Sequence, residues 1–241
     1  MKNILEYDAV EMSENGRDLI VLDQSVLPAQ QKFLHLTTAE QMFYAMTLLK
    51  VRGAPLLGIT AAMGLAVCMN RFKTKSVPAF EKEFLRVKHY LYISRKTPIN
   101  LTWALDRMER CFYSGLEELA GTDSEEDMVR ELKLRLTAEA RSIKQEDTRM
   151  CLDIAEAGLA VLRAGAGILT YGNAGHLASS HSGTALGPIY HAQHKGYMPR
   201  VYACETRPGM EGARLTAFEL MKAGVDVTLV CDNMVADLMS R

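Results

Sequence analysis

The stretch Ile168-Leu-Thr-Tyr-Gly-Asn-Ala-Gly175 decides the fold of the second half of the chain. Its first four residues are apolar or favour strands, and a loop of small residues follows them. The spacing predicts a buried strand over residues 168–171 that ends in a ligand-facing turn. Glycine stands at the centre of this turn and carries no reactive group. Any chemistry at the turn must therefore come from residues elsewhere in the sequence.

Strand and helix patterns alternate after this turn. The spacing predicts a helix over 177–195, a strand over 200–204, a helix over 213–223 that Gly224 ends, and a strand over 227–231. A βαβαβ order of this kind requires parallel strands joined by helices. Ligands gather beyond the carboxyl ends of such strands, which are followed here by residues 172–175, 205–211 and 232–234.

The first half of the chain is predicted to be mainly helical after a short β-hairpin region. Asn15-Gly16 is a hairpin signal between expected strands over 4–7 and 19–22. The expected helices cover residues 38–50, 57–71, 76–94, 101–119 and 124–163, and the last of these is predicted to break near 144–147.

The overall prediction is an α/β fold with two domains. Residues 1–145 form a mainly helical N-terminal domain, and residues 146–241 form a Rossmann-like domain with an incomplete parallel sheet. We place the boundary at the expected helix break.

Composition limits the classes of partner. The 28 basic and 29 acidic residues leave a formal net charge of -1, which argues against binding to nucleic acid or to an anionic membrane. The five cysteines are scattered and odd in number, which favours a reducing compartment. We expect a cytoplasmic protein, because we find no signal peptide and no apolar run of about 18 residues.

Common cofactor motifs are absent from the sequence. It contains neither G-x-G-x-x-G nor G-x-x-x-x-G-K-[ST], so neither a dinucleotide nor a nucleoside triphosphate is supported. His191 and His194 could share a helical face, but a third ligand at suitable spacing is missing. We therefore expect no metal.

Two basic loops are candidate phosphate sites. In Val51-Arg-Gly-Ala-Pro55, backbone N–H groups could point at an anion beside Arg52, although the same residues also suit an ordinary interhelical turn. Arg95 and Lys96 could converge on the same phosphate or could be a solvated helix end.

A third polar loop, Glu205-Thr-Arg-Pro-Gly-Met-Glu211, follows a predicted strand. Its acidic residues and Arg207 should lie at the ligand-bearing edge of the sheet. Alternatively, Glu and Arg side chains could pair with each other and brace the loop.

Six segments spread over nearly the whole chain form a family signature that is more specific than any one of them alone. They are Val51-Arg-Gly-Ala-Pro-Leu-Leu-Gly-Ile-Thr-Ala-Ala62, Ser94-Arg-Lys-Thr-Pro-Ile-Asn-Leu-Thr-Trp-Ala-Leu105, Ile168-Leu-Thr-Tyr-Gly-Asn-Ala-Gly175, Gly183-Thr-Ala-Leu-Gly187, Glu205-Thr-Arg-Pro-Gly-Met-Glu-Gly-Ala-Arg-Leu-Thr216 and Cys231-Asp-Asn-Met234. The order and spacing of these segments resemble those of the methylthioribose-1-phosphate isomerases. That family includes ribose-1,5-bisphosphate isomerases and, more distantly, the alpha, beta and delta regulatory subunits of initiation factor 2B.

The resemblance implies a cytoplasmic homodimer that binds a sugar phosphate between a helical and a Rossmann-like domain, with no metal or organic cofactor. It implies that Arg95 grips the phosphate. The other implied substrate-binding residues are Arg52, Gly53, Ala54, Gly172, Asn173, Ala174 and Glu211. The implied reaction is an aldose–ketose isomerisation in methionine salvage, an intramolecular oxidoreduction.

The sequence departs from the family at three positions. Gly172 stands where the family has a cysteine, Glu211 stands where it has a glutamine, and the family's aspartate, in a Gly-Ala-Asp-Arg motif, would lie beyond Arg241. The catalytic residues are therefore unassigned. Cys204 and His176 are the local candidates to replace the missing groups.

Two hypotheses follow. The first is an isomerase homologue acting on S-methyl-5-thioribose 1-phosphate or a related 5-deoxypentose 1-phosphate. The second is a catalytically inactive binding or regulatory module, or a truncated remnant, of the same family.

Overall fold

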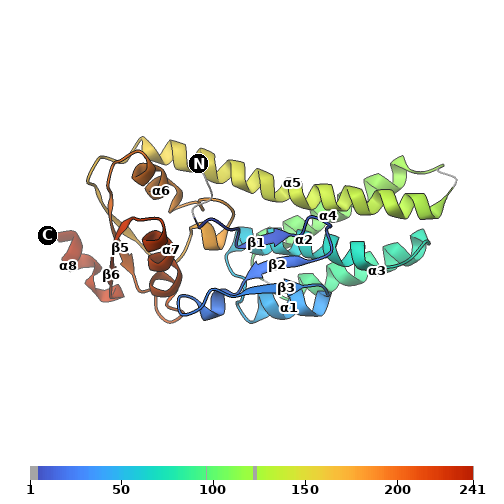
Figure 1. Ribbon diagram of the computed structural model, residues 1–241, viewed down its shortest axis with the longest axis horizontal. Helices are drawn as coiled ribbons and strands as arrows, with labels where there is room; N and C mark the ends of the chain where they lie inside the picture. Colours follow the sequence, from blue (N-terminus) through green and yellow to red (C-terminus); the bar gives the residue numbers. More distant parts are fainter. Residues whose placement is uncertain (1–4, 96, 122–123, 241) are drawn as a thin grey trace. The chain divides into compact units, whose positions relative to one another are not determined.

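The computed structural model describes residues 5–95, 97–121 and 124–240 (Figure 1). The chain divides into two compact units. The helical unit comprises Val10–Ser25 and Lys32–Glu146, and the sheet unit comprises the residues up to Ala9, Val26–Gln31 and the residues from Asp147 onward. The expected domain boundary after residue 145 stays a prediction.

The helical unit contains an antiparallel sheet of β1 (Val10–Met12), β2 (Leu19–Leu22) and β3 (Phe33–Leu36). The Asn15-Gly16 turn is confirmed, because Gly16 has a positive φ of 68° and its N–H donates to the Ser13 carbonyl. The strand expected over 4–7 is wrong, since residues 5–7 form a turn, and Ile4 lies outside the described residues. Val10 pairs with Val21 instead, which buries both side chains.

Four helices and the first part of a fifth complete this unit. They are α1 (Ala39–Thr47), α2 (Ala54–Arg71), α3 (Val77–Tyr92), α4 (Ile99–Glu118) and α5 (Glu125–Leu159). Thr38 caps α1 through a capping box with Gln41, as its sequence position suggested. Short 3-10 segments lie at Gln24–Val26, His176–Ala178 and Asp232–Met234 in the chain as a whole.

The central helix of the helical unit is α2. By length and mean hydropathy alone it is long and apolar enough to cross a bilayer. Within the protein 72% of this window is buried, which is the behaviour of a core helix. Gly58 lets α2 approach α4 closely, because a Cβ at this position would lie 2.8 Å from the Asn100 carbonyl oxygen.

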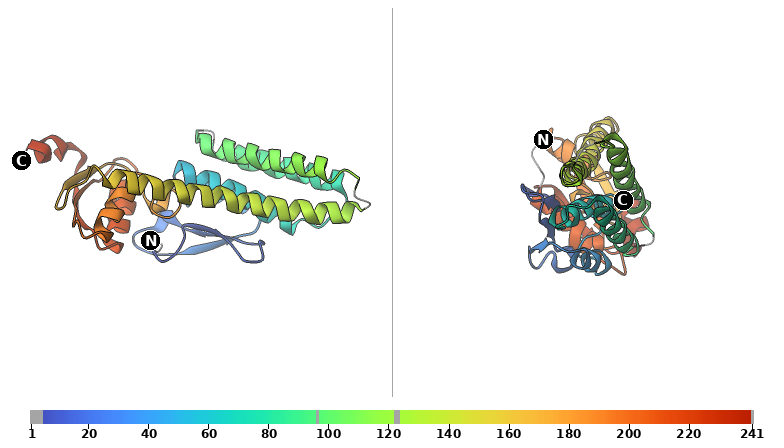
Figure 2. Two further views of the ribbon diagram at one scale, coloured as in Figure 1. Left: turned by 90° about the horizontal axis from the view of Figure 1, so that it is seen from above. Right: turned by 90° about the vertical axis from the view of Figure 1, so that its right-hand side faces the viewer.

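The expected break near 144–147 is also wrong, because α5 runs without interruption for 35 residues. Residues 125–157 contain neither proline nor glycine, so nothing in the backbone chemistry interrupts the helix. Within the helical unit α4 lies alongside α5 (Figure 2). Ion pairs from Arg107 to Glu139 and from Arg135 to Glu118 join the two helices.

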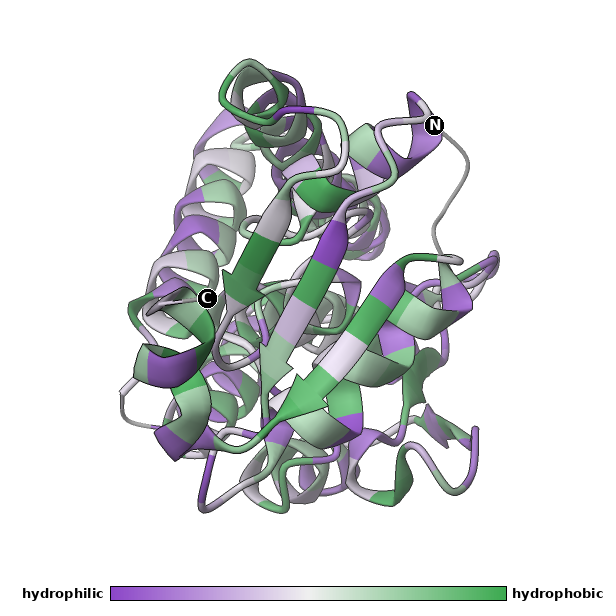
Figure 3. Ribbon diagram, turned by 90° about the vertical axis from the view of Figure 1, so that its left-hand side faces the viewer, coloured by the Kyte–Doolittle hydropathy of each residue, from purple (hydrophilic) through white to green (hydrophobic). Residues whose placement is uncertain are grey.

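The sheet unit contains the predicted parallel sheet, in the order β4-β5-β6 (Figure 3). Its strands are β4 (Gly167–Thr170), β5 (Arg200–Cys204) and β6 (Asp226–Val230), and its helices besides the end of α5 are α6 (Gly187–His194), α7 (Ala217–Lys222) and α8 (Val235–Ser240). A core cluster packs helix residues against the sheet: Leu186, Ile189, Tyr190, Val201, Leu220 and Val225. The Rossmann-like α/β prediction is therefore confirmed.

The helix expected over 177–195 is wrong in its first half. Only the segment from Gly187 is α-helical, and residues 179–186 form turns that fold back on the loop after β4. The Thr184 N–H donates to the Ala174 carbonyl at 3.0 Å. Gly183 has a φ of 74° and lies so close to Gly175 that no side chain would fit between them.

Candidate functional site

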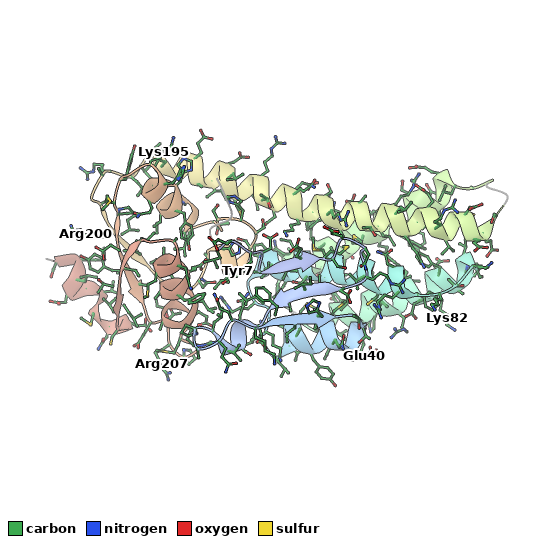
Figure 4. The ribbon with its side chains drawn as sticks, in the orientation of Figure 1. Tyr7, Glu40, Lys82, Lys195, Arg200 and Arg207 are labelled. Atoms are coloured by element: carbon green, nitrogen blue, oxygen red, sulfur yellow. The ribbon has the colours of Figure 1, made fainter. Side chains whose placement is uncertain are left out.

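Three loops are joined by hydrogen bonds at the carboxyl ends of the parallel strands. The Gly172 N–H donates to Thr206 Oγ1 at 2.9 Å. The N–H groups of Thr206 and Arg207 donate to the two carboxylate oxygens of Asp232 at 2.9 and 2.8 Å. Arg207, on the loop after β5, is labelled in Figure 4. The structure therefore brings together the three loops that the strand order placed at one edge.

Thr206 holds an uncommon backbone conformation in this cluster. Its φ is 62°, a region that β-branched residues rarely adopt. Its N–H donates to Asp232 and its hydroxyl accepts from the Gly172 N–H, and these two hydrogen bonds hold it there. Residues in such conformations concentrate at functional sites, which supports a binding role for this edge of the sheet.

Gly172 occupies an open position in the cluster. Its φ is 76°, and a Cβ built on it would meet no other atom within 4 Å. The surroundings therefore have room for a side chain, whereas the backbone conformation favours glycine.

Asn173 points its amide into the protein. Its Nδ2 donates to Thr216 Oγ1 at 3.1 Å and to Glu219 Oε1 at 2.5 Å. The Thr216 hydroxyl donates in turn to the Gly172 carbonyl at 2.6 Å. Asn173 thus shapes the loop from within.

The backbone N–H groups of Ala174 and Gly175 have no protein acceptor among the described residues. They follow a strand end and belong to a loop of small residues. Successive free N–H groups in such a loop suit a negatively charged or strongly polar ligand.

Glu219 on α7 is fully buried below the loop. Burial raises the pKa of its carboxyl to about 7, although the hydrogen bonds from Asn173 and the Leu177 N–H act in the opposite direction. The carboxylate lies directly against Gly175, where a Cβ would collide with it.

Glu211 lies half-buried where the chain enters a π-helical turn, Gly212–Thr216, ahead of α7. Its carboxylate folds back over Gly209. Among the described residues neither Glu205 nor Glu211 forms an ion pair with Arg207, so the alternative of a braced Glu–Arg loop is wrong. π-helical turns occur frequently at functional sites.

The remaining predicted site residues lie in the helical unit. Gly53, with a φ of 95°, precedes α2, and Pro55 occupies the first turn of that helix. Arg52 is half-buried, and Ala54 is exposed. The loop thus forms the N-terminus of a long helix, as an anion site requires.

Arg95 is half-buried on the loop that leads into α4. The Thr47 hydroxyl, at the end of α1, lies 3.5 Å from the carbonyl of the neighbouring Ser94. The close approach of Gly58 to Asn100 brings the starts of α2 and α4 together. The two basic loops therefore lie at the same end of the helical unit, and Lys96 lies outside the described residues.

The two substitute catalytic groups are both buried. Burial raises the pKa of the Cys204 thiol, which disfavours a reactive thiolate. Burial lowers the pKa of His176, whose Nδ1 faces the His181 carbonyl. Across the described residues no group of three His, Cys, Asp or Glu side chains is arranged to hold a metal ion.

Residues 50–241 match the initiation factor 2 subunit family. The chain belongs to this family. Curated relatives include a methylthioribose-1-phosphate isomerase of Symbiobacterium thermophilum, 45% identical over 98% of this chain and 63% of the relative. A 5-deoxyribose 1-phosphate isomerase of Petrotoga mobilis is 46% identical over 96% of this chain and 64% of its own length.

A solved family structure has the same fold. The 5-methylthioribose 1-phosphate isomerase of Pyrococcus horikoshii superposes with a TM-score of 0.87 at 32% identity, over 100% of this chain and 65% of that one. The chain thus spans somewhat under two thirds of the length of these relatives.

Sequence reasoning missed the residues that shape the loop from below. Thr216 ends one of the six motif segments, and Glu219 lies outside all of them. A signal was present, because Thr216 and Glu219 are three residues apart and so share a face of the predicted helix. A carboxylate on the buried face of a helix needs a polar partner, and that partner is Asn173.

Proposed function

We propose that this chain binds a pentose 1-phosphate and serves an aldose–ketose isomerase. The substrate class is S-methyl-5-thioribose 1-phosphate or a related 5-deoxypentose 1-phosphate. Relatives with isomerase names are 45–46% identical to this chain over most of its length. The observation that carries the proposal is the loop at 172–175, at the end of β4. Its free N–H groups suit the polar sugar.

In this proposal the basic loops take the phosphate. Arg52 and Arg95 supply positive charge beside the N-terminus of α2, where Gly53 and Ala54 leave the backbone accessible. The sheet unit contributes Gly172 and Ala174 to sugar binding, as the family resemblance implies. Glu211 lies in the loop after β5, where the family resemblance implies a substrate contact.

The chemistry demands an acid near the sugar ring. A phosphate ester on the anomeric carbon prevents ordinary hemiacetal opening, so a proton must reach the ring oxygen for the ring to open before C1 of the sugar can be reduced and C2 oxidised. We assign no residue of this chain to that step, since Cys204 and His176 are buried.

A second candidate function is a sugar-phosphate-binding regulatory module. Gly172 favours it, because glycine cannot supply the thiol that the isomerase resemblance implies at this position. The family name, initiation factor 2 subunit, also fits a protein that regulates rather than catalyses.

Incubation of the folded protein with S-methyl-5-thioribose 1-phosphate separates the candidates. The proposal predicts ketose formation above the rate of a heat-unfolded sample. Binding without ketose formation would support the regulatory module. A folded sample that does neither would contradict both functions.

We further propose a cytoplasmic homodimer that binds neither nucleic acid nor membrane. The near-neutral charge supports the last two points. Light scattering on the eluting peak from size-exclusion chromatography tests the dimer, which should have twice the 26.8 kDa mass of one chain.

A further inference from the structure

We propose that Glu219 is a positioning residue, which holds the 172–175 loop in its binding shape through Asn173 and the Leu177 N–H. The inference deepens the proposed function and rests on it, because the loop is the proposed sugar site. Glu219 itself reaches no ligand, since its side chain is fully buried.

The two carboxylate oxygens of Glu219 act on opposite sides of Gly175. Oε1 accepts from the Asn173 amide before it, and Oε2 accepts from the Leu177 N–H after it at 3.4 Å. The absence of a side chain at Gly175 lets the backbone rest on the carboxylate. One buried group therefore fixes both ends of the segment that carries the free N–H groups of Ala174 and Gly175.

A carboxylate is the side chain that fits these two donors. It offers an acceptor on each oxygen, whereas glutamine offers one acceptor and one donor. A glutamine at position 219 would therefore set its NH₂ group against either Asn173 or the Leu177 N–H. Among the described residues no cation pairs with Glu219, so its partners are the loop and its immediate neighbours.

Glu219 is surrounded by titratable groups whose pKa values are shifted away from neutral pH, whereas its own pKa lies near neutral pH. Tyr190 on α6 lies beside the carboxyl, and burial raises its pKa well above 10.0. The pKa of Tyr7 is also raised by burial, and that of His176 is lowered by burial. Since the pKa of Glu219 itself is about 7, protonation below that pH removes one acceptor from the loop.

Amide hydrogen exchange of the ligand-free protein measures the loop directly. The reporting amides are Thr184 and Ala178, which donate to the Ala174 and Gly175 carbonyls, and the reference is Val201 in β5. In Glu219→Gln we expect loop protection at pH 8 to fall about tenfold relative to the reference, the effect of one lost buried hydrogen bond.

A double variant gives a conservative rescue. Asn173→Asp with Glu219→Gln reverses donor and acceptor, so the Gln NH₂ donates to Asp and its carbonyl accepts from Leu177. We expect it to recover loop protection to within about threefold of the wild type, following the logic of a double-mutant cycle. Asn173→Ala, which removes the same hydrogen bond from the loop side, replaces Glu219→Gln if that variant does not fold.

Equal loss of protection at the loop and at Val201 would overturn the proposal, as would no loss or no rescue. Calorimetry with S-methyl-5-thioribose 1-phosphate provides the second readout, and Glu219→Gln should bind about tenfold more weakly at pH 8. A wild type that does not bind this ligand would refute the proposed function, while the exchange data would still decide whether Glu219 positions the loop.

Discussion

At the scale of single residues, Gly172 shows how backbone conformation limits the site. We expect Gly172→Ala to lower the free energy of unfolding by about 1 kcal/mol, because its φ of 76° is unfavourable for a residue with a Cβ although the space is empty. Gly167→Ala in β4 is the matched control, since it meets only Tyr202 at 3.7 Å. Urea unfolding measures both, and equal effects would contradict the conformational argument.

Glu219 makes a second residue-scale prediction, on pH. Its folded pKa of about 7 exceeds the ordinary 4.5, so the folded state holds this proton more tightly than the unfolded state does. Glu219 therefore makes its full contribution to the free energy of unfolding below pH 4.5. That contribution, on the order of 3 kcal/mol, is lost as the pH rises through 7.

Urea unfolding of wild type and Glu219→Gln at pH 5 and pH 8 isolates this group. The free energy of unfolding of the variant should rise relative to that of the wild type from pH 5 to pH 8, because glutamine has no proton to lose. The lowered pKa of buried His176 changes the stability with pH in the opposite direction, but His176 is present in both proteins. A difference that does not change with pH would contradict the prediction.

At the scale of elements, the contact between α2 and α4 makes an unusual prediction for a helical glycine. Alanine inside a helix is normally favoured over glycine by about 1 kcal/mol. At Gly58, however, the new Cβ would lie 2.8 Å from a backbone oxygen that cannot move alone. We expect Gly58→Ala to lower the stability by about 1–3 kcal/mol.

Gly64→Ala is the control on the same helix. Its Cβ would meet the end of the flexible Met42 side chain, which can rotate away. Thermal unfolding compares the two variants. If Gly64→Ala proved as damaging as Gly58→Ala, the close contact with the Asn100 carbonyl would not explain the loss of stability.

The elements also show what the sequence could predict. Helix periodicity and caps predicted α1 to α4 closely, and the parallel sheet followed from alternating strands and helices. The turns over 179–186 were included in the predicted helix although only Ala185 and Leu186 among them are apolar. Gly183 was the missed signal, since its conformation is required by contact with Gly175, a residue that only the folded chain brings near it.

The loops that form the site were predictable from the sequence, but the buried contacts that shape the 172–175 loop were not. The strand order placed the 172–175, 205–211 and 232–234 loops at one edge, which the hydrogen bonds of Asp232 support. The inward direction of Asn173 could not be predicted, because it depends on Glu219, 46 residues away. Long-range polar partners of this kind leave no periodic trace in a sequence.

At the scale of the whole molecule, the proposed function assigns phosphate binding to the basic loops of the helical unit. Removing the positive charge in Arg95→Ala should weaken the affinity for S-methyl-5-thioribose 1-phosphate by at least about tenfold, as the loss of a charge-assisted hydrogen bond to phosphate does. Arg110→Ala, on an exposed position of α4, is the control and should leave the affinity unchanged. Calorimetry measures both variants, and equal affinities would remove Arg95 from the site.

The most direct measurement is a calorimetric titration of the wild-type protein with S-methyl-5-thioribose 1-phosphate at pH 8, beside a titration with methylthioribose that lacks the phosphate. The account predicts saturable binding of the phosphorylated sugar and much weaker binding of the unphosphorylated one, because Arg52 and Arg95 act on the phosphate. Absence of binding by a folded sample, or equal binding of both sugars, would contradict the central claim.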